Sequence, residues 1–399
     1  MEEHGALQNI VILDLTRVLC GPYCSSLLAD MGAEVIKIEN PDCGDDTRAF
    51  APFRNGESMY FANLNRNKKG ITLNLKSTEG KEMFFKLVSE VDVVMENFRP
   101  GVMDKLGLGY EVLKGVNDQI IYAAASGFGS YGPYSNRPGY DILSQAMGGL
   151  MSVTGWPDGP PTRAGNGMGD ILAGMYLAIG ILAAINSRNI NGKGQRVDIA
   201  LADSIVATLG VEAQRYFSTG IVPERLGNRY APLAPYDSFK AKDGYFIIAC
   251  GNQRLYKDFC YEVIRRPELW EDERFHEQTD RVKNQAVLKE IIEEWAADYT
   301  IEEAVDLVMA GGVPSGPILN LQQISQNEHI VGVREMFIDV EHPVIGPMTV
   351  GGNPIKMMST MPKVRTPAPM LGQHNEEVYL RLLGIGSEMV EALHDRGVI

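Results

Sequence analysis

The sequence has few of the residues that build disulfide or metal frameworks. Five of the 399 residues are cysteines, an odd number, and no two of them are spaced as CxxC. The six histidines form no HxH or HExxH pair. We therefore expect no disulfide scaffold and no metal site, and the reducing cytoplasm is the predicted compartment.

The chain also lacks an excess of positive charge and a long hydrophobic run. It has 37 Lys and Arg against 51 Asp and Glu, a formal net charge of −14, so we expect neither nucleic acid nor an anionic membrane as a partner. The longest uncharged apolar run, 171–185, is shorter than a membrane span and predicts a buried helix. The acidic N-terminus is unlike a signal peptide.

The first third of the chain alternates between strand-like and helix-like segments. Strands are predicted at 10–15, 33–38, 70–75, 92–96 and 120–125. Helices are predicted at 23–31, after the capping residues Ser77 and Thr78, and at 104–116. This alternation is typical of an α/β fold with a parallel sheet and helices on its faces.

The rest of the chain suggests a second, smaller unit. A Gly- and Pro-rich stretch, 127–169, precedes predicted helices at 171–187 and 200–219. A strand at 245–250 and helices at 283–299 and 301–310 follow, then a short strand at 348–350 and a helix at 375–383. We predict a large domain in two parts, 1–224 and 326–399, and a small α+β domain at 225–325.

One acidic residue stands where a glycine-rich segment becomes an apolar helix. Asp170 ends the segment Gly165–Asp170. As a structural residue it is an N-cap. As a functional residue it is a covalent nucleophile, since the helix dipole favours the ionised carboxylate and backbone N–H groups at the helix start can stabilise oxyanions.

Other motifs favour an anion pocket more than dinucleotide or hydrolase chemistry. Gly127–Gly132 matches GxGxxG, but Pro133 and Pro138 follow it, and no GxSxG motif occurs. Several basic residues lie near predicted strand ends, where parallel sheets bind ligands. They are Arg17, Lys37, Arg48, Arg66, Lys68, Lys69, Lys76, Arg99, Lys105 and Arg137.

A series of motifs resembles the class III CoA-transferases, also called the CaiB/BaiF family, which includes the formyl-CoA and acetyl-CoA:oxalate enzymes. The motifs keep their order over essentially the whole chain. They are Leu13–Pro22, Gly32–Glu39, Gly44–Arg48, Glu96–Gly101, Ser126–Gly129, Gly139–Asp141, Gly192–Gln195, Leu226–Arg229 and Leu371–His374.

The resemblance implies a CoA pocket and a catalytic group. Asp170 matches the nucleophile that forms an acyl anhydride and then an aspartyl-CoA thioester. The CoA contacts carry over to Leu19, Cys20, Leu73, Lys76, Asn97, Phe98, Arg99, Lys105, Arg137 and Tyr140. The acceptor side and a closing loop carry over to Phe50, Tyr60, Gly251, Asn252 and Gln253. Asn40 and Phe50 depart from the formyl-CoA enzymes, which have an arginine and a tryptophan there.

The resemblance also implies a shape and a substrate class. The family's Rossmann-like large domain is built from both chain ends, and two chains interlock. The expected substrates are an acyl-CoA and a small carboxylate, with no permanent cofactor, and the acetyl-CoA:oxalate branch is the nearest match. The donor and acceptor acids stay open. Two alternatives are an α-methylacyl-CoA racemase, disfavoured because Tyr140 replaces its histidine base, and a non-catalytic CoA-binding protein.

Overall fold

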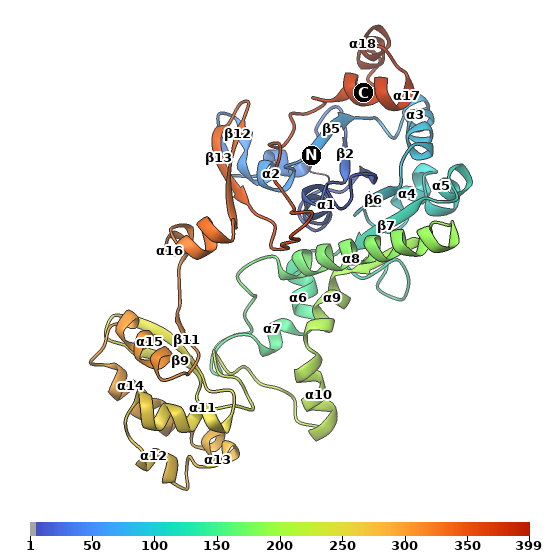
Figure 1. Ribbon diagram of the computed structural model, residues 1–399. Coiled ribbons are helices and arrows are strands. Elements are labelled where there is room, and N and C mark those ends of the chain that lie inside the picture. Colours follow the sequence, from blue (N-terminus) through green and yellow to red (C-terminus); the bar gives the residue numbers. More distant parts are fainter. Residues whose placement is uncertain (1–4) are drawn as a thin grey trace. The chain divides into compact units, whose positions relative to one another are not determined.

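The larger of two structural units is organised around a parallel sheet of six strands. The computed structural model describes residues 5–399 (Figure 1). The strand order is β5-β2-β1-β6-β7-β8, and every pair is parallel. The strands are β1 (Val11–Asp14), β2 (Glu34–Glu39), β5 (Lys68–Thr72), β6 (Val93–Glu96), β7 (Ile121–Ser126) and β8 (Arg196–Ala200). The predicted α/β class with a large parallel sheet is confirmed.

Apolar side chains on both faces of the sheet explain the helices that cover it. Ile12 packs on one face with α1 (Cys20–Asp30) and α8 (Met168–Asn191). Its neighbour Leu13 packs on the other face with α3 (Thr78–Ser89), α17 (Asn375–Leu383) and α18 (Ser387–Asp395). Successive strand residues alternate between faces, so one apolar strand supplies two cores. The C-terminal helices lie beside α3 (Figure 1).

Shorter elements complete this unit. The helices are α2 (Met59–Leu64), α4 (Val102–Leu106), α5 (Tyr110–Val116), α6 (Asp141–Met147), α9 (Leu201–Thr208) and α10 (Gly210–Thr219), with a 3₁₀ turn at Asp46–Ala49 and a π-turn at His329–Val333. A further helix, α7 (Leu150–Val153), begins at the last residue of this unit and continues into the second. Two hairpins pair β3 (Phe53–Arg54) with β4 (Glu57–Ser58), and β12 (Phe337–His342) with β13 (Gly346–Gly351).

The second unit comprises Met151–Thr162 and Gly220–Gln326. Its antiparallel sheet has the order β11-β10-β9, from β9 (Tyr236–Ala241), β10 (Gly244–Ala249) and β11 (Ser315–Pro317). Its helices are α11 (Gln253–Asp258), α12 (Glu268–Glu271), α13 (Gln278–Lys283), α14 (Gln285–Ala296), α15 (Ile301–Ala310) and α16 (Leu321–Ser325), with a π-turn at Phe259–Val263. The structure divides the chain at 219/220 and 326/327, five residues and one residue away from the predicted boundaries at 224/225 and 325/326.

Several predicted elements were wrong in extent. The helices predicted at 23–31 and 171–187 are Cys20–Asp30 and Met168–Asn191 in the structure. The helix predicted at 104–116 is divided into α4 and α5, because Gly107 takes φ +76° and ends α4. The helix predicted at 200–219 breaks before Gly210, and the one predicted at 283–299 begins only at Gln285. The third strand begins at Lys68 and ends at Thr72, two or three residues before the predicted positions. Strand β8 was not predicted.

Candidate active site

A crevice lies where the strand order of the parallel sheet reverses. The chain runs outward from β1 to β2 and β5, then returns to place β6 beside β1. Loops leave the carboxyl ends of β1 and β6 in opposite directions at this point, which opens a ligand crevice in such sheets. A cavity of about 190 Å³ is found there.

Eight of the predicted site residues line this cavity. They come from the loop after β1, the loop after β6, the segment before α6, and the start of α8. They are Leu19, Cys20, Asn97, Phe98, Arg99, Arg137, Tyr140 and Asp170. The prediction therefore brought together residues from four separate segments of the chain.

Asp170 lies in the first turn of α8 and is not its N-cap. The helix begins at Met168, and its N-cap is Gly167, so the structural interpretation from sequence was wrong by three positions. Glycines let this turn pack closely: a Cβ on Gly169 would lie 2.1 Å from the Ser144 hydroxyl, and one on Gly174 would lie 2.6 Å from the Cys20 carbonyl. The sequence pattern thus places α8 tightly against α6 and α1.

The carboxylate of Asp170 has an unusual electrostatic environment. Burial and then the nearby charge of Asp141 raise its pKa to about 7. Within residues 5–399, no Lys, Arg or His forms an ion pair with it. The helix dipole was expected to favour the ionised carboxylate, and burial outweighs that effect.

Asp141 at the start of α6 contacts the first turn of α8, and sequence reasoning did not single it out as a candidate site residue. Its Oδ1 accepts a hydrogen bond from the Gly169 N–H at 2.8 Å, and its Oδ2 accepts one from the Gln145 side chain at 2.8 Å. Arg163 pairs with the same carboxylate at 3.4 Å. Asp141 therefore fixes the first turn of α8 while its own charge is partly compensated. The signal in the sequence was the motif Gly139–Asp141.

Three arginines and one acidic residue, Asp46, line the cavity mouth, which leaves it a net positive charge. Arg17 pairs with Asp46 at 3.3 Å and stacks over Phe98, and Arg137 stacks over Tyr134. Arg99 is exposed beside them. Guanidinium groups bind phosphates well, so the mouth suits an anionic ligand.

Four of the basic residues grouped at the strand ends belong to the fold and not to an anion pocket. Lys37 and Lys68 are fully buried in ion pairs with Asp45 and Asp14. Arg66 pairs with Asp30, and Arg48 with Glu39, also with little exposure. Fewer basic residues are therefore available to bind an anion than the sequence predicted.

The remaining predicted site residues lie outside the lining of the cavity. Leu73 is buried in the sheet core, and Lys76 and Lys105 are exposed. Phe50 stacks edge-on against Tyr60, whose pKa is raised by burial and by the charge of Asp170.

The predicted closing loop, Gly251–Gln253, belongs to the second unit. Asn252 caps α11 through its Oδ1, which accepts the Leu255 N–H at 2.9 Å. Gln253 accepts a hydrogen bond from the buried Arg281. Both side chains thus have structural partners within that unit.

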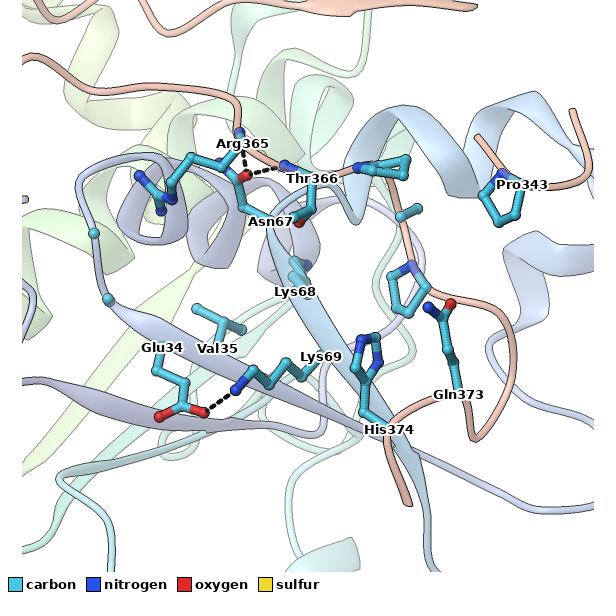
Figure 2. Close-up of a pocket in the computed structure, with 15 residues that line it drawn as sticks. Glu34, Val35, Asn67, Lys68, Lys69, Pro343, Arg365, Thr366, Gln373 and His374 are labelled. Atoms are coloured by element: carbon cyan, nitrogen blue, oxygen red, sulfur yellow. Dashed lines mark hydrogen bonds and ion pairs between the residues drawn. The ribbon is translucent and has the colours of Figure 1, made fainter. Parts of the chain in front are cut away.

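A larger cavity, of about 500 Å³, lies at the opposite edge of the sheet, at the amino ends of β2 and β5 (Figure 2). Its polar groups already bond to one another. Lys69 pairs with Glu34 at 2.9 Å, and the Asn67 side chain accepts the backbone N–H groups of Arg365 and Thr366 (Figure 2). Size alone therefore does not identify the site, whereas the unpaired Asp170 does.

Other classes of site receive little support. Among residues 5–399, no group of three His, Cys, Asp or Glu side chains is arranged to hold a metal. Gly127–Gly132 opens no helix, and the next one begins at Asp141. Among residues 5–399, α8 is the one helix long and apolar enough to cross a membrane, and its inner face packs on α1 and the sheet.

Comparison with known proteins identifies the class of enzyme. The model for CoA-transferase family III matches residues 7–375, and the chain belongs to that family. It is accordingly an enzyme whose substrates are CoA thioesters.

Individual relatives agree over nearly the full length. The chain is 40% identical to an acetyl-CoA:oxalate CoA-transferase of Acetobacter aceti, over 92% of this chain and 94% of the relative. It is 40% identical to a succinyl-CoA:mesaconate CoA-transferase of Haloarcula hispanica, over 97% and 99%. A CaiB/BaiF family protein from Brucella suis has a similar structure, with a TM-score of 0.84 and 37% identity, over 95% of this chain and all of that one.

Proposed function

We propose that this protein transfers CoA from an acyl-CoA to a small dicarboxylic acid, with Asp170 as the covalent carrier. The observation that carries the proposal is a partly buried carboxylate without a cation partner, lining a cavity whose mouth holds three arginines. Such a carboxylate is poorly solvated and therefore more nucleophilic than one in water.

The reaction proceeds through four exchanges at carbonyl carbons. Ionised Asp170 attacks the thioester carbonyl, which forms a mixed anhydride and expels the CoA thiolate. The thiolate attacks the aspartyl carbonyl, which releases the donor acid and forms an aspartyl-CoA thioester. The acceptor carboxylate attacks this thioester, giving a second anhydride and free thiolate. The thiolate then attacks the acceptor's carbonyl, which forms the new acyl-CoA and regenerates the Asp170 carboxylate. One thioester replaces another, so the balance needs no ATP.

The oxyanion donors belong to α1 more than to α8. The sequence analysis placed them at the start of α8, but the Met168, Gly169 and Ile171 N–H groups bond to Asn166, Asp141 and Gly167. The start of α1 has no side-chain cap, and Leu19 and Cys20 line the cavity. Uncapped N–H groups at a helix start are suited to a developing negative charge.

The acceptor acid is proposed to be a short dicarboxylate. Oxalate and mesaconate, named in the two relatives described above, are both dicarboxylic acids. A second carboxylate gives a positively charged cavity mouth a group to hold while the first one reacts.

An interlocked dimer in the cytoplasm completes the proposal. The outer faces of α8 and α10 carry large apolar side chains, among them Ile179, Ile190 and Phe217, which are 58%, 80% and 76% exposed. Exposed large apolar side chains in this number are expected where a partner subunit covers them. A sedimentation measurement that gives a monomer at micromolar concentration would contradict the dimer.

Trapping of the intermediate tests the catalytic role. The enzyme is incubated with acetyl-CoA and quenched in acid, and its peptides are analysed by mass spectrometry. We expect a CoA adduct on the peptide containing Asp170, released by hydroxylamine, and none in Asp170→Ala. Turnover without any such adduct would refute the covalent role. No turnover and no adduct would favour a non-catalytic CoA-binding protein, and loss of deuterium from the α-carbon of a labelled acyl-CoA would favour a racemase.

A panel of acids then tests the substrate class. Acetyl-, succinyl- and formyl-CoA are each offered with oxalate, mesaconate, glutarate and the monocarboxylate butyrate. We expect transfer to at least one dicarboxylate and little to butyrate. Preferential transfer to butyrate would overturn the dicarboxylate assignment and leave the transferase class intact.

A further inference from the structure

The loop between β1 and α1 has a backbone conformation that its sequence does not favour. Val18 takes φ +69°, in the left-handed region. A β-branched residue rarely adopts this region, because its side chain crowds the backbone. Arg17, Val18, Leu19 and Cys20 all line the candidate active site. Something outside the loop must hold it in this conformation.

Buried side chains bind the backbone on either side of Arg17. The Thr16 carbonyl accepts a hydrogen bond from Lys37 Nζ at 2.8 Å, and the Val18 N–H donates to Asp45 Oδ1 at 3.3 Å. Lys37 and Asp45 are themselves paired at 2.9 Å, and their side chains are 0% and 1% exposed. The pair therefore bridges the two backbone groups that flank the residue facing the cavity.

Two other side chains complete the set. Asp14 accepts the Thr16 N–H at 2.9 Å. Asn97, at the other side of the crevice, accepts the Arg17 N–H at 2.8 Å and donates to the Arg17 carbonyl at 2.7 Å. Five successive backbone groups of a loop are thus bonded to side chains, where backbone partners are the rule in regular structure.

We infer that Lys37 and Asp45 are positioning residues for acyl-CoA binding: they hold Thr16 and Val18 so that the loop forms one wall of the cavity. The inference rests on the proposed function of that cavity. Neither residue lines the cavity itself. They act through the loop, which presents Arg17 beside Phe98 and sets the start of α1.

A matched pair of variants separates positioning from general stability. Asp45→Asn keeps the size and the acceptor oxygen but removes the charge that holds Lys37. Asp30→Asn does the same in the buried Asp30–Arg66 pair, which makes no hydrogen bond to residues 16–18. Binding of free CoA is measured by calorimetry, together with KM and kcat. We expect Asp45→Asn to weaken CoA binding and raise KM about tenfold, with a smaller change in kcat. Asp30→Asn should leave both values within about twofold of wild type.

Equal CoA binding by Asp45→Asn and wild type would overturn the inference, and so would equal losses in both variants. If wild type itself binds no CoA, the proposed function fails instead, so the two failures are distinguishable. Hydrogen exchange on the wild-type enzyme covers the case in which Asp45→Asn does not fold. Slow exchange without ligand at Val18, whose N–H group bonds to Asp45, supports the inference, and exchange there as fast as in an open loop contradicts it.

Discussion

Asp14 and Asp170 belong to the same structural unit, yet their surroundings shift the pKa values of the two carboxyl groups in opposite directions. Burial alone would raise the pKa of Asp14, but Lys68, Lys37 and two hydroxyl donors lower it to about 2. Lys68 lies at 3.1 Å and the Ser25 hydroxyl at 2.6 Å. Asp170 has no such partners, and burial with the charge of Asp141 raises its pKa to about 7.

The difference shows what separates a structural carboxylate from a reactive one. The oxygens of Asp14 are occupied by hydrogen bonds and neutralised by ammonium groups, so it is a poor nucleophile that locks the loop after β1. Asp170 keeps its lone pairs available and is held in place through Gly169 and Asp141. Its position costs stability and favours reactivity, a common trade at functional sites.

The largest effect is expected from removing the reactive carboxylate. Asp170→Ala should lower kcat by about 10³-fold or more, because the proposed anhydride and thioester intermediates both form on this carboxylate. The fold should be retained, since the side chain has no cation partner to leave unpaired. Transfer assays and circular dichroism measure the two properties. Transfer within tenfold of wild type would mean that Asp170 is not the carrier.

The converse experiment removes the structural carboxylate. Asp14→Ala leaves the Lys68 ammonium group buried without its partner, and breaking a buried pair in this way costs about 3–5 kcal/mol. Urea denaturation should show this loss in the free energy of unfolding, while Asp170→Ala changes it much less. Similar stability of the two variants would remove the distinction drawn between the two carboxylates.

The fold was largely predictable because local patterns of apolar residues indicate the strands of the sheet. Ile12 and Leu13 are apolar on successive positions, which indicates a strand buried on both faces. The capping Ser77 marked the start of α3, and the apolar run 171–185 indicated the helix α8 but not its ends. The breaks at Gly107 and Gly210 were missed, because a glycine inside a helical pattern is compatible with either outcome.

The sequence predicted which residues form the site better than it predicted the charge and the pairing of their side chains. The motifs identified Asp170 and seven further lining residues. The raised pKa of Asp170 depends on burial and on the charge of Asp141, which belongs to another helix. The same is true of Lys37 and Lys68, which the sequence grouped with anion-binding residues. Tertiary packing decides whether a lysine binds a ligand or pairs with a buried aspartate, and the spacing of residues along the chain does not encode that outcome.

The pH dependence sharpens the comparison further. With a pKa of about 7, raised by burial and then by Asp141, Asp170 loses its nucleophilic form as the pH falls through 7. We expect kcat/KM for the acyl-CoA to fall about tenfold per pH unit below that value. Asp141→Asn removes the neighbouring charge and should move this limb to lower pH. A profile that is flat from pH 5.5 to 8 would contradict the assignment.

The stability of the fold should change with pH in the direction opposite to the activity, because ionised Asp170 favours activity and lowers stability. The pKa of Asp170 in the folded state, about 7, lies above that of an aspartate in the unfolded chain, so the ionised group destabilises the fold fully above pH 7 and not at all below about pH 4. Asp170→Asn should therefore raise the Tm at pH 8, and the gain should disappear as the pH falls between those limits. A gain that is constant with pH would point to a packing effect instead.

The smallest expected effects concern the rim, where Arg99 and Lys105 follow the same strand and were predicted together as CoA contacts. Arg99 lines the cavity and forms no ion pair within the described chain, whereas Lys105 on α4 lies outside the lining. Arg99→Ala should raise KM for the acyl-CoA about fivefold to tenfold, and Lys105→Ala about twofold, with kcat little changed in both. Because a guanidinium holds phosphate oxygens by directed hydrogen bonds, Arg99→Lys should recover only part of the loss. An effect of Lys105→Ala that exceeds that of Arg99→Ala would place the phosphates of CoA along α4 and outside the crevice.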